Sequence, residues 1–283
     1  MSLDFPVLPP ELEREIFEEV ATQWPETIPS LLLVSHRVYE WIEKIKYRTV
    51  TSTGELSTCS LATLRRAIQS NSKAPSFFHT HVRHLFVRRL FRGKETENMM
   101  LPEILRVCTG IQSLAFIRCG IPSSLLPTLA TLRPRQLWMR IDSLVFETDL
   151  CRPMLTCVTH LALWDRVTSI HSDIAAWLSL LAMFPSLTHL MIIAAKPSLA
   201  PHILASSKKF KVLVTYSDIS GKELDNADDR YVNIGVHKFA EQWLMGTRGG
   251  NNFWARAEAF IAKKRRGEIQ PVWRYWIEDA DGI

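Results

Sequence analysis

Three histidines recur at equivalent positions of a short repeated pattern, and imidazole is a common ligand for metal ions. They are His84, His160 and His189. Neighbouring strands lie about 4.8 Å apart, and the pattern places His84 three strands away from His160. The three side chains are therefore too far apart to hold one metal ion. We expect no metal site, and histidines that are solvated or contact a partner.

A second group of residues is basic. Arg83, Arg88, Arg89 and Arg92 lie close together in the sequence. Arginine binds carboxylate and phosphate groups with two parallel hydrogen bonds. The cluster is either a solvated edge, which is the more common case, or a site for an acidic or phosphorylated segment. The sequence leaves both interpretations open.

No catalytic motif is found. The patterns GxSxG, GxxxxGK[ST], GxGxxG and HExxH do not occur, and no cysteine lies in a CxxC pair or beside a histidine at finger spacing. The glycines after Arg248 lack the Lys-Ser/Thr of a phosphate loop. We therefore expect a protein without catalytic residues and without a cofactor, not an enzyme.

Composition limits the class of protein further. The chain has 283 residues, of which 47% are hydrophobic, enough for a packed core. The longest nearly apolar run, residues 174–184, is too short to cross a bilayer, and no secretory leader is visible at the amino terminus. We expect no membrane contact, five reduced cysteines, and a cytoplasmic or nuclear location. The net charge of +5 is dispersed, so nucleic acid is an improbable partner.

The first fifty residues predict three short helices. A helix begins near Pro10, with acidic residues after it and apolar residues at helical spacing, and it ends before Trp24-Pro25. A further helix begins after Ser35, which is a good N-cap residue. So small a unit cannot bury all of its apolar side chains by itself, and we expect some of them to contact something else.

These residues carry a resemblance to a known family. Leu8-Pro9-x-Glu11-Leu12-x-x-x-Ile16-Phe17, followed by Leu33-Val34-Ser35-x-x-Val38-x-x-Trp41, resembles an F-box, and the later part is especially similar to F-box-like proteins of mushroom-forming (basidiomycete) fungi. In that family the module binds the Skp adaptor of cullin-RING ubiquitin ligases. The resemblance implies that adaptor binding involves Leu8, Pro9, Leu12, Ile16 and Val34. The other interpretation is that the helices only cap the domain that follows.

From residue 80 onward a short apolar pattern recurs at intervals of 23 to 29 residues. Its central leucines are Leu85, Leu114, Leu137, Leu161, Leu190 and Leu213. This period and pattern are typical of leucine-rich repeats, in which every unit adds one strand to a curved parallel sheet. Helical stretches between the strands would form the convex side, and residues 47–51 would form an opening strand without a flexible linker.

Successive side chains of a strand face opposite sides, so alternation predicts which residues line the concave face. The candidate target-binding residues on that face are Phe86, Arg88, Trp138, Arg140, His160, Trp164, His189 and Met191. Their apolar members would make an unusually large open patch, which favours a partner site. The alternative is that the C-terminal segment folds over the patch.

The C-terminal segment, residues 231–283, leaves the repeat pattern. Asn252 is the predicted cap of a helix that ends near Gly267, after a run of four cations that either stabilises the helix end or forms a localisation or nucleic-acid patch. The last aromatic residues, 273–277, are similar to the terminal segment of the same fungal group and are predicted to seal the last repeat.

The sequence thus predicts an α/β fold with three parts: an F-box-like helical module (residues 1–50), a short irregular leucine-rich-repeat solenoid (51–230) and a C-terminal cap (231–283). The expected function is that of a substrate-recognition adaptor in an SCF-type ubiquitin ligase. The module would bind a Skp-type adaptor, and through it cullin, while the repeats bind an unknown target protein. A repeat scaffold whose module no longer docks is the alternative.

Overall fold

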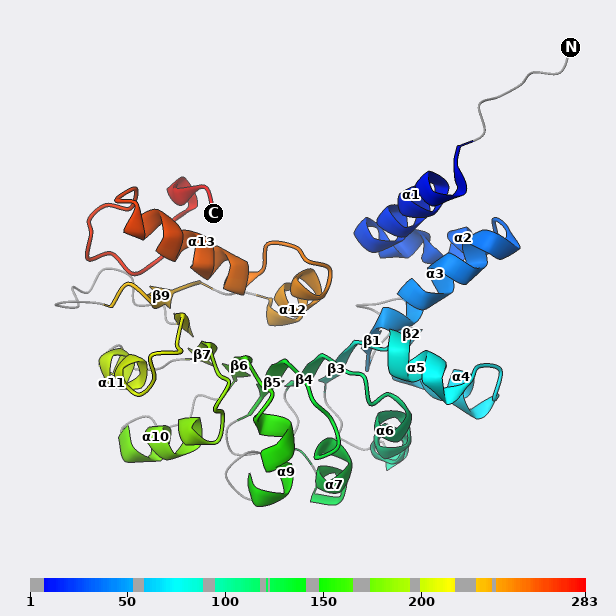
Figure 1. The fold of residues 1–283 in the computed structure, drawn as a ribbon, viewed down its shortest axis with the longest axis horizontal. Helices are drawn as coiled ribbons and strands as arrows, with labels where there is room; N and C mark the ends of the chain where they lie inside the picture. The colour runs from blue at the N-terminus through cyan, green and yellow to red at the C-terminus, as the bar shows by residue number, and fades with distance from the viewer. Residues whose placement is uncertain are drawn as a thin grey trace, which may run out of the picture.

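A computed structural model describes residues 8–52, 59–88, 95–117, 121, 123–140, 148–164, 174–193, 199–216, 228–235 and 238–283. In these ranges the chain forms an α/β fold around one nine-stranded parallel sheet (Figure 1). The α/β class predicted from the sequence is confirmed. Arg89 and Arg92 of the basic cluster lie outside the described residues.

The N-terminal helices form as the sequence predicts. They are α1 (Pro10–Gln23), the 3-10 turn η1 (Pro25–Thr27), α2 (Ile28–Leu31) and α3 (His36–Arg48). Proline occupies the first position of α1, where its missing N–H costs no hydrogen bond, and two glutamates follow in the first turn. Ser35 caps α3, because its hydroxyl accepts a hydrogen bond of 3.3 Å from the Val38 amide.

The sheet continues directly from the last helical residue, Arg48. Its strands are β1 (Thr49–Thr51), β2 (Cys59–Ser60), β3 (His84–Arg88), β4 (Ser113–Ile117), β5 (Gln136–Met139), β6 (His160–Leu163), β7 (His189–Ile193), β8 (Val212–Tyr216) and β9 (Tyr231–Asn233). Their order is β2-β1-β3-β4-β5-β6-β7-β8-β9, so the chain proceeds in one direction along the sheet after β2.

The register of the strands aligns the six leucines predicted from the repeat pattern. Leu85 pairs with Leu114, and the pairing continues strand by strand to Leu213. The reason is that each leucine must enter the same layer of the core, and a shift by one residue would turn it to the other face. The short strands β2 and β9 were not foreseen, and β9 carries the sheet past residue 230.

Two apolar layers enclose the sheet, one on each face. On the convex face lie α4 (Leu61–Gln69), α5 (Pro75–His81), α6 (Glu95–Val107), η2 (Ser123–Leu125), α7 (Leu126–Leu129), α9 (Thr148–Leu155), α10 (Ile174–Ala182) and α11 (Ala200–Ala205). Figure 1 shows these elements outside the curve of the sheet, where the leucine layer is buried. On the concave face lie α12 (Phe239–Thr247) and α13 (Phe253–Arg265).

The chain beyond α13 returns to the last strand. Asn252 caps α13 by accepting hydrogen bonds from the amides of Trp254 and Ala255, as predicted. Tyr275 is fully buried and stacks on Tyr231 of β9, with ring centroids 5.0 Å apart. Trp276 forms a parallel bridge with Asn233. The terminal aromatic segment therefore covers the open edge of the sheet, before the short turn η4 (Asp279–Asp281).

Within the described ranges, none of the helices has the length and apolar character needed to cross a bilayer.

Candidate partner-binding surfaces

The N-terminal helices have an inner apolar face that holds the module together. Ala21, Ile28, Val38 and Ile42 are buried and form one small core. They come from α1, α2 and α3, so each of the three helices contributes to the inner face. This core explains why forty residues hold a defined arrangement.

The same helices have an outer apolar face that nothing in the described chain covers. Leu8 and Ile16 are each 51% exposed, Leu12 is 48% exposed and Pro9 is exposed. Leu12 and Ile16 are four residues apart on α1, so they share one side of that helix. Val34, in the turn before α3, is 56% exposed. The residues predicted for adaptor binding are therefore all accessible.

An ion pair links α1 and α3 beside these residues. The guanidinium of Arg37, in the first turn of α3, binds the carboxylate of Glu13, beside Leu12 on α1. Val34 lies three residues before Arg37. Leu33, which is 86% exposed, extends the surface, although the family motif did not single it out. We call Leu8, Leu12, Ile16, Leu33 and Val34 the outer face of the module.

The module is joined rigidly to the sheet. The ring of Tyr47 packs edge-on against Phe77 and Phe78 of α5, with centroids 5.8 and 5.9 Å away. Lys73 forms a 2.6 Å ion pair with Glu43, which is nearly buried on α3. Because α3 runs into β1 without a linker, the module has a fixed position relative to the sheet.

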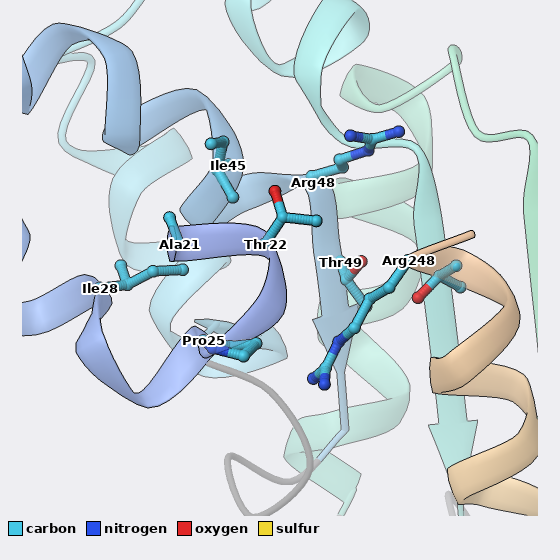
Figure 2. A pocket seen from close by; sticks show the side chains of 9 residues that line it. Ala21, Thr22, Pro25, Ile28, Ile45, Arg48, Thr49 and Arg248 are labelled. Atoms are coloured by element: carbon cyan, nitrogen blue, oxygen red, sulfur yellow. The ribbon is translucent and has the colours of Figure 1, made fainter. Parts of the chain in front are cut away.

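A small pocket marks the junction between the module and the rest of the chain. It is lined by Ala21, Thr22, Ile28 and Ile45 of the module and by Thr247 and Arg248 at the end of α12. Figure 2 shows the apolar side chains on one side and Arg248 reaching in from α12, with the guanidinium of Arg48 pointing the other way. The pocket is too small and too apolar to indicate a ligand by itself. It shows that α12 reaches the module.

The predicted open surface on the concave face is not found. The facing of the side chains was predicted correctly, since Phe86, Trp138 and Met191 all point to that side, but they are at most 1% exposed. Helices α12 and α13 cover them. The prediction that they form an open target-binding patch is therefore wrong, and the alternative of a covering C-terminal segment is correct.

The physical reason is that both sides of this contact are aromatic. Trp243 of α12 packs on Phe86, with ring centroids 5.3 Å apart, and its indole N–H donates a 2.9 Å hydrogen bond to Ser113. Phe253 of α13 packs on Trp138, with centroids 5.2 Å apart. Neither side could stay exposed without a large loss of hydrophobic free energy, so each buries the other.

Three further members of the predicted patch, His160, Trp164 and His189, are also drawn into this contact. His189 is buried, and its Nε2 atom lies 2.9 Å from Glu258 of α13. The His160 ring stacks on the His189 ring, with centroids 4.0 Å apart. The ring of Trp164 packs against the ring of Phe239, in α12, with centroids 3.8 Å apart. Arg88 and Arg140 are partly buried at the carboxyl ends of β3 and β5.

The three repeated histidines do not converge on a metal site. His84 lies against Trp243, three strands from the stacked pair of His160 and His189. Burial lowers the pKa of His84 and of His160 to about 3, and the pKa of His189 also falls, so all three are neutral at pH 7. The described residues contain no group of three His, Cys, Asp or Glu side chains that could hold a metal ion.

The structure reveals one surface that motif reasoning missed. A cleft of about 650 Å³ separates α1 and α3 of the module from α5 and the amino ends of β3 and β4. Its lining includes Trp41, Lys44, Arg48, His81 and Arg83. Its cations, Lys44, Arg48 and Arg83, come from separate parts of the sequence, and the parallel pairing of the strands brings them together.

Comparisons with known proteins do not identify the chain. It matches no protein-family model and no curated protein.

Proposed function

We propose that this chain is a substrate-recruiting adaptor of an SCF-type (cullin-RING) ubiquitin ligase. Its N-terminal module would be an F-box that binds a Skp-type adaptor, and the strand-and-helix units would be leucine-rich repeats that hold a target protein. The chain would contribute positioning rather than chemistry, because holding two proteins in a suitable geometry accelerates the transfer between them.

The observation that carries this proposal is the outer face of the module. Leu8, Leu12, Ile16, Leu33 and Val34 stay exposed although the chain has two large apolar cores that could have taken them. Exposed leucine and isoleucine side chains forgo the stabilisation that burial would give, and exposed apolar surfaces of this kind mark interaction sites. A second protein that buries this face would recover that free energy.

The rigid joint between module and sheet supports the same function. Tyr47 fixes α3 to α5, Glu43 fixes α3 to Lys73 just before α5, and α3 continues into β1. An adaptor of this kind must hold its target at a set distance from the ligase, which a flexible linker would not do.

The test is co-purification of the full chain with a fungal Skp adaptor, scored by size-exclusion chromatography. We expect a one-to-one complex that the variant Leu8→Ala/Leu12→Ala loses. The matched control is Leu178→Ala/Val272→Ala, which removes two exposed apolar side chains elsewhere on the surface. This control should bind as well as the unmodified chain, and both variants should keep its melting temperature.

Two results would speak against the proposal. If the well-folded chain forms no complex, the alternative of a repeat scaffold with a non-docking module is favoured. If Leu8→Ala/Leu12→Ala unfolds the chain, these residues support the fold rather than a partner, and the outer face loses its assigned role.

A further inference from the structure

A row of arginines lies across the amino ends of neighbouring strands. The register pairs Thr49 with His84, His84 with Ser113 and Ser113 with Gln136. The residues immediately before these four are Arg48, Arg83, Gln112 and Arg135. Side chains at equivalent positions of paired strands point the same way, so these four form one row.

Backbone hydrogen bonds hold the row together. The Arg83 amide donates to the Arg48 carbonyl at 3.0 Å, the Gln112 amide to the Arg83 carbonyl at 2.7 Å, and the Arg135 amide to the Gln112 carbonyl at 2.8 Å. The four positions are therefore as regular as the sheet itself. We call Arg48, Arg83 and Arg135, with Gln112 between the last two, the arginine row.

The charges of the row are available to a ligand. Arg48 and Arg135 are exposed, and within the described part of the chain neither forms an ion pair. Arg83 donates one hydrogen bond of 3.0 Å to the Gly110 carbonyl, which orients its guanidinium without neutralising it. Three guanidinium groups in one register, with no ion pair among the described residues, leave positive charge for an anionic partner.

The cleft beneath the module opens over one end of this row. Arg48, Arg83 and Gln112 all line it, together with Lys44 and His81. The positive charges act on two histidines: Lys44 and Arg83 both lower the pKa of His81, which lines the cleft, and Arg48 and Arg83 lower the pKa of His84 on β3, in each case after burial as the main cause. Glu43 of α3 opposes this effect at His81 by raising its pKa, while Glu18 of α1 is engaged by Arg14 at 2.6 Å.

Carboxylates limit the positive surface on two sides. Glu15, Glu18 and Glu19 line the α1 wall of the cleft, and Glu258 stands at the amino end of β7. A nucleic acid, with a continuous line of phosphates, would meet these carboxylates. A short stretch of anionic side chains fits between these carboxylates. Arg48 and Arg135 are three strand intervals apart, about 14 Å, which an extended peptide spans with about four residues.

We propose that the arginine row binds a short acidic segment of a target protein, in extended conformation, across the amino ends of β1, β3, β4 and β5. Arg48, Arg83 and Arg135 pair with its anionic side chains, and the side-chain amide of Gln112 bonds its backbone. This inference rests on the proposed function in one respect, since the segment belongs to the protein that the ligase would modify. It also supplies a recognition surface in place of the covered concave face.

The test measures binding of a fluorescent peptide with four central glutamates, flanked by glycine and serine, to the full chain by anisotropy at low salt. We expect the variant Arg48→Gln/Arg135→Gln to lose about tenfold in affinity, as expected when two charged contacts are removed. The control Arg106→Gln/Lys208→Gln removes the same charge from other exposed positions and should change affinity less than twofold.

Further probes identify the ligand chemistry. A peptide with glutamines in place of the glutamates should not bind. A peptide with two phosphoserines that binds at least as tightly, and depends on the same arginines, also supports the assignment and shows that the segment can be phosphorylated. The assignment is overturned if the acidic peptide does not bind, if the control variant weakens binding equally, or if oligouridylate of equal charge binds more tightly.

The same variants separate this inference from the proposed function. Leu8→Ala/Leu12→Ala should lose the Skp adaptor and keep the acidic peptide, whereas Arg48→Gln/Arg135→Gln should do the reverse. If the second variant loses the adaptor instead, the row belongs to the adaptor interface and the inference fails, while the adaptor function stands. If only peptide binding is found, the inference stands without the ligase.

Discussion

The Nε2 atom of His189, on β7, lies 2.9 Å from the Oε1 atom of Glu258, on α13. This contact ties the covering helix to the amino end of the sheet. The carboxylate can only accept a hydrogen bond, so the Nε2 atom of His189 carries the proton of the neutral ring. Glu258 raises the pKa of His189, but burial lowers it more, and the net direction is downward. The histidines beneath the covering helices are therefore held neutral.

From this follows a dependence of stability on pH. The pKa values of His84 and His160 lie near 3 in the folded chain and near 6.5 in the unfolded chain, so the unfolded state binds more protons below pH 6.5. The free energy of unfolding is therefore unaffected by these histidines above about pH 6.5. It falls as the pH drops towards 3, by at most about 1.4 kcal/mol per pH unit for each histidine. The melting temperature should therefore decrease from pH 8 to pH 5.

The control for this prediction is His160→Gln. Because it removes one of the titrating groups, its melting temperature should fall less steeply between pH 8 and pH 5 than that of the unmodified chain. Equal slopes for both proteins would mean that other groups control the pH dependence.

Trp243 should be among the most important side chains of the covering helices. It is fully buried against Phe86 and donates a hydrogen bond to Ser113. Trp243→Ala should lower the free energy of unfolding by about 3–5 kcal/mol, because it leaves a large cavity. Chemical denaturation measures this, with Trp273→Ala, at an exposed position, as the control. A loss below about 1 kcal/mol at Trp243 would show that α12 contributes little to stability.

The two apolar faces of the N-terminal module should respond differently to truncation. Ile42 is fully buried in the inner core, whereas Ile16 is half exposed on the outer face. Ile42→Ala should cost about 2–5 kcal/mol of stability, and Ile16→Ala less than about 1 kcal/mol. The comparison is made by thermal unfolding of the two variants. Similar losses in both would mean that the outer face packs within the chain.

The cap of α13 gives a smaller, local effect. The side chain of Asn252 accepts hydrogen bonds from two backbone amides, so Asn252→Ala should lower the free energy of unfolding by about 1 kcal/mol. Gly246→Ala should also destabilise, because a methyl group there would lie 2.1 Å from the side-chain nitrogen Nδ2 of Asn252 and would displace the capping side chain. Asn252→Asp keeps an acceptor at this position and should restore most of the loss. A fully stable Asn252→Ala variant would contradict the assigned cap.

Thiol reactivity tests the burial of two cysteines. Burial raises the pKa of Cys59 and of Cys108 to about 12, so neither forms a reactive thiolate at pH 8. Alkylation of the native chain, followed by mass spectrometry of its peptides, should leave both unmodified while the partly exposed Cys157 reacts. Unfolding in denaturant should make them reactive. Rapid alkylation of native Cys59 would contradict its buried position in the edge strand β2.

The sequence alone determined the repeating part of the fold. Leu85, Leu114 and their successors mark the buried layer because strands alternate with a period of two, and a one-residue shift would expose them. The N-terminal helices and the caps Ser35 and Asn252 were also predictable, because proline, acidic residues and short polar side chains act on the nearest backbone groups. The exposure of the outer face followed from the small size of the module.

Only the tertiary structure decided what covers the concave face and where charges gather. Trp243 and Phe253 could have remained part of a separate cap, and no local signal shows that they pack on Phe86 and Trp138. Arg48, Arg83 and Arg135 form no motif, because their neighbourhood depends on strand pairing across connections of different length. Local structure follows from neighbouring residues, but these surfaces depend on contacts between segments far apart in the chain.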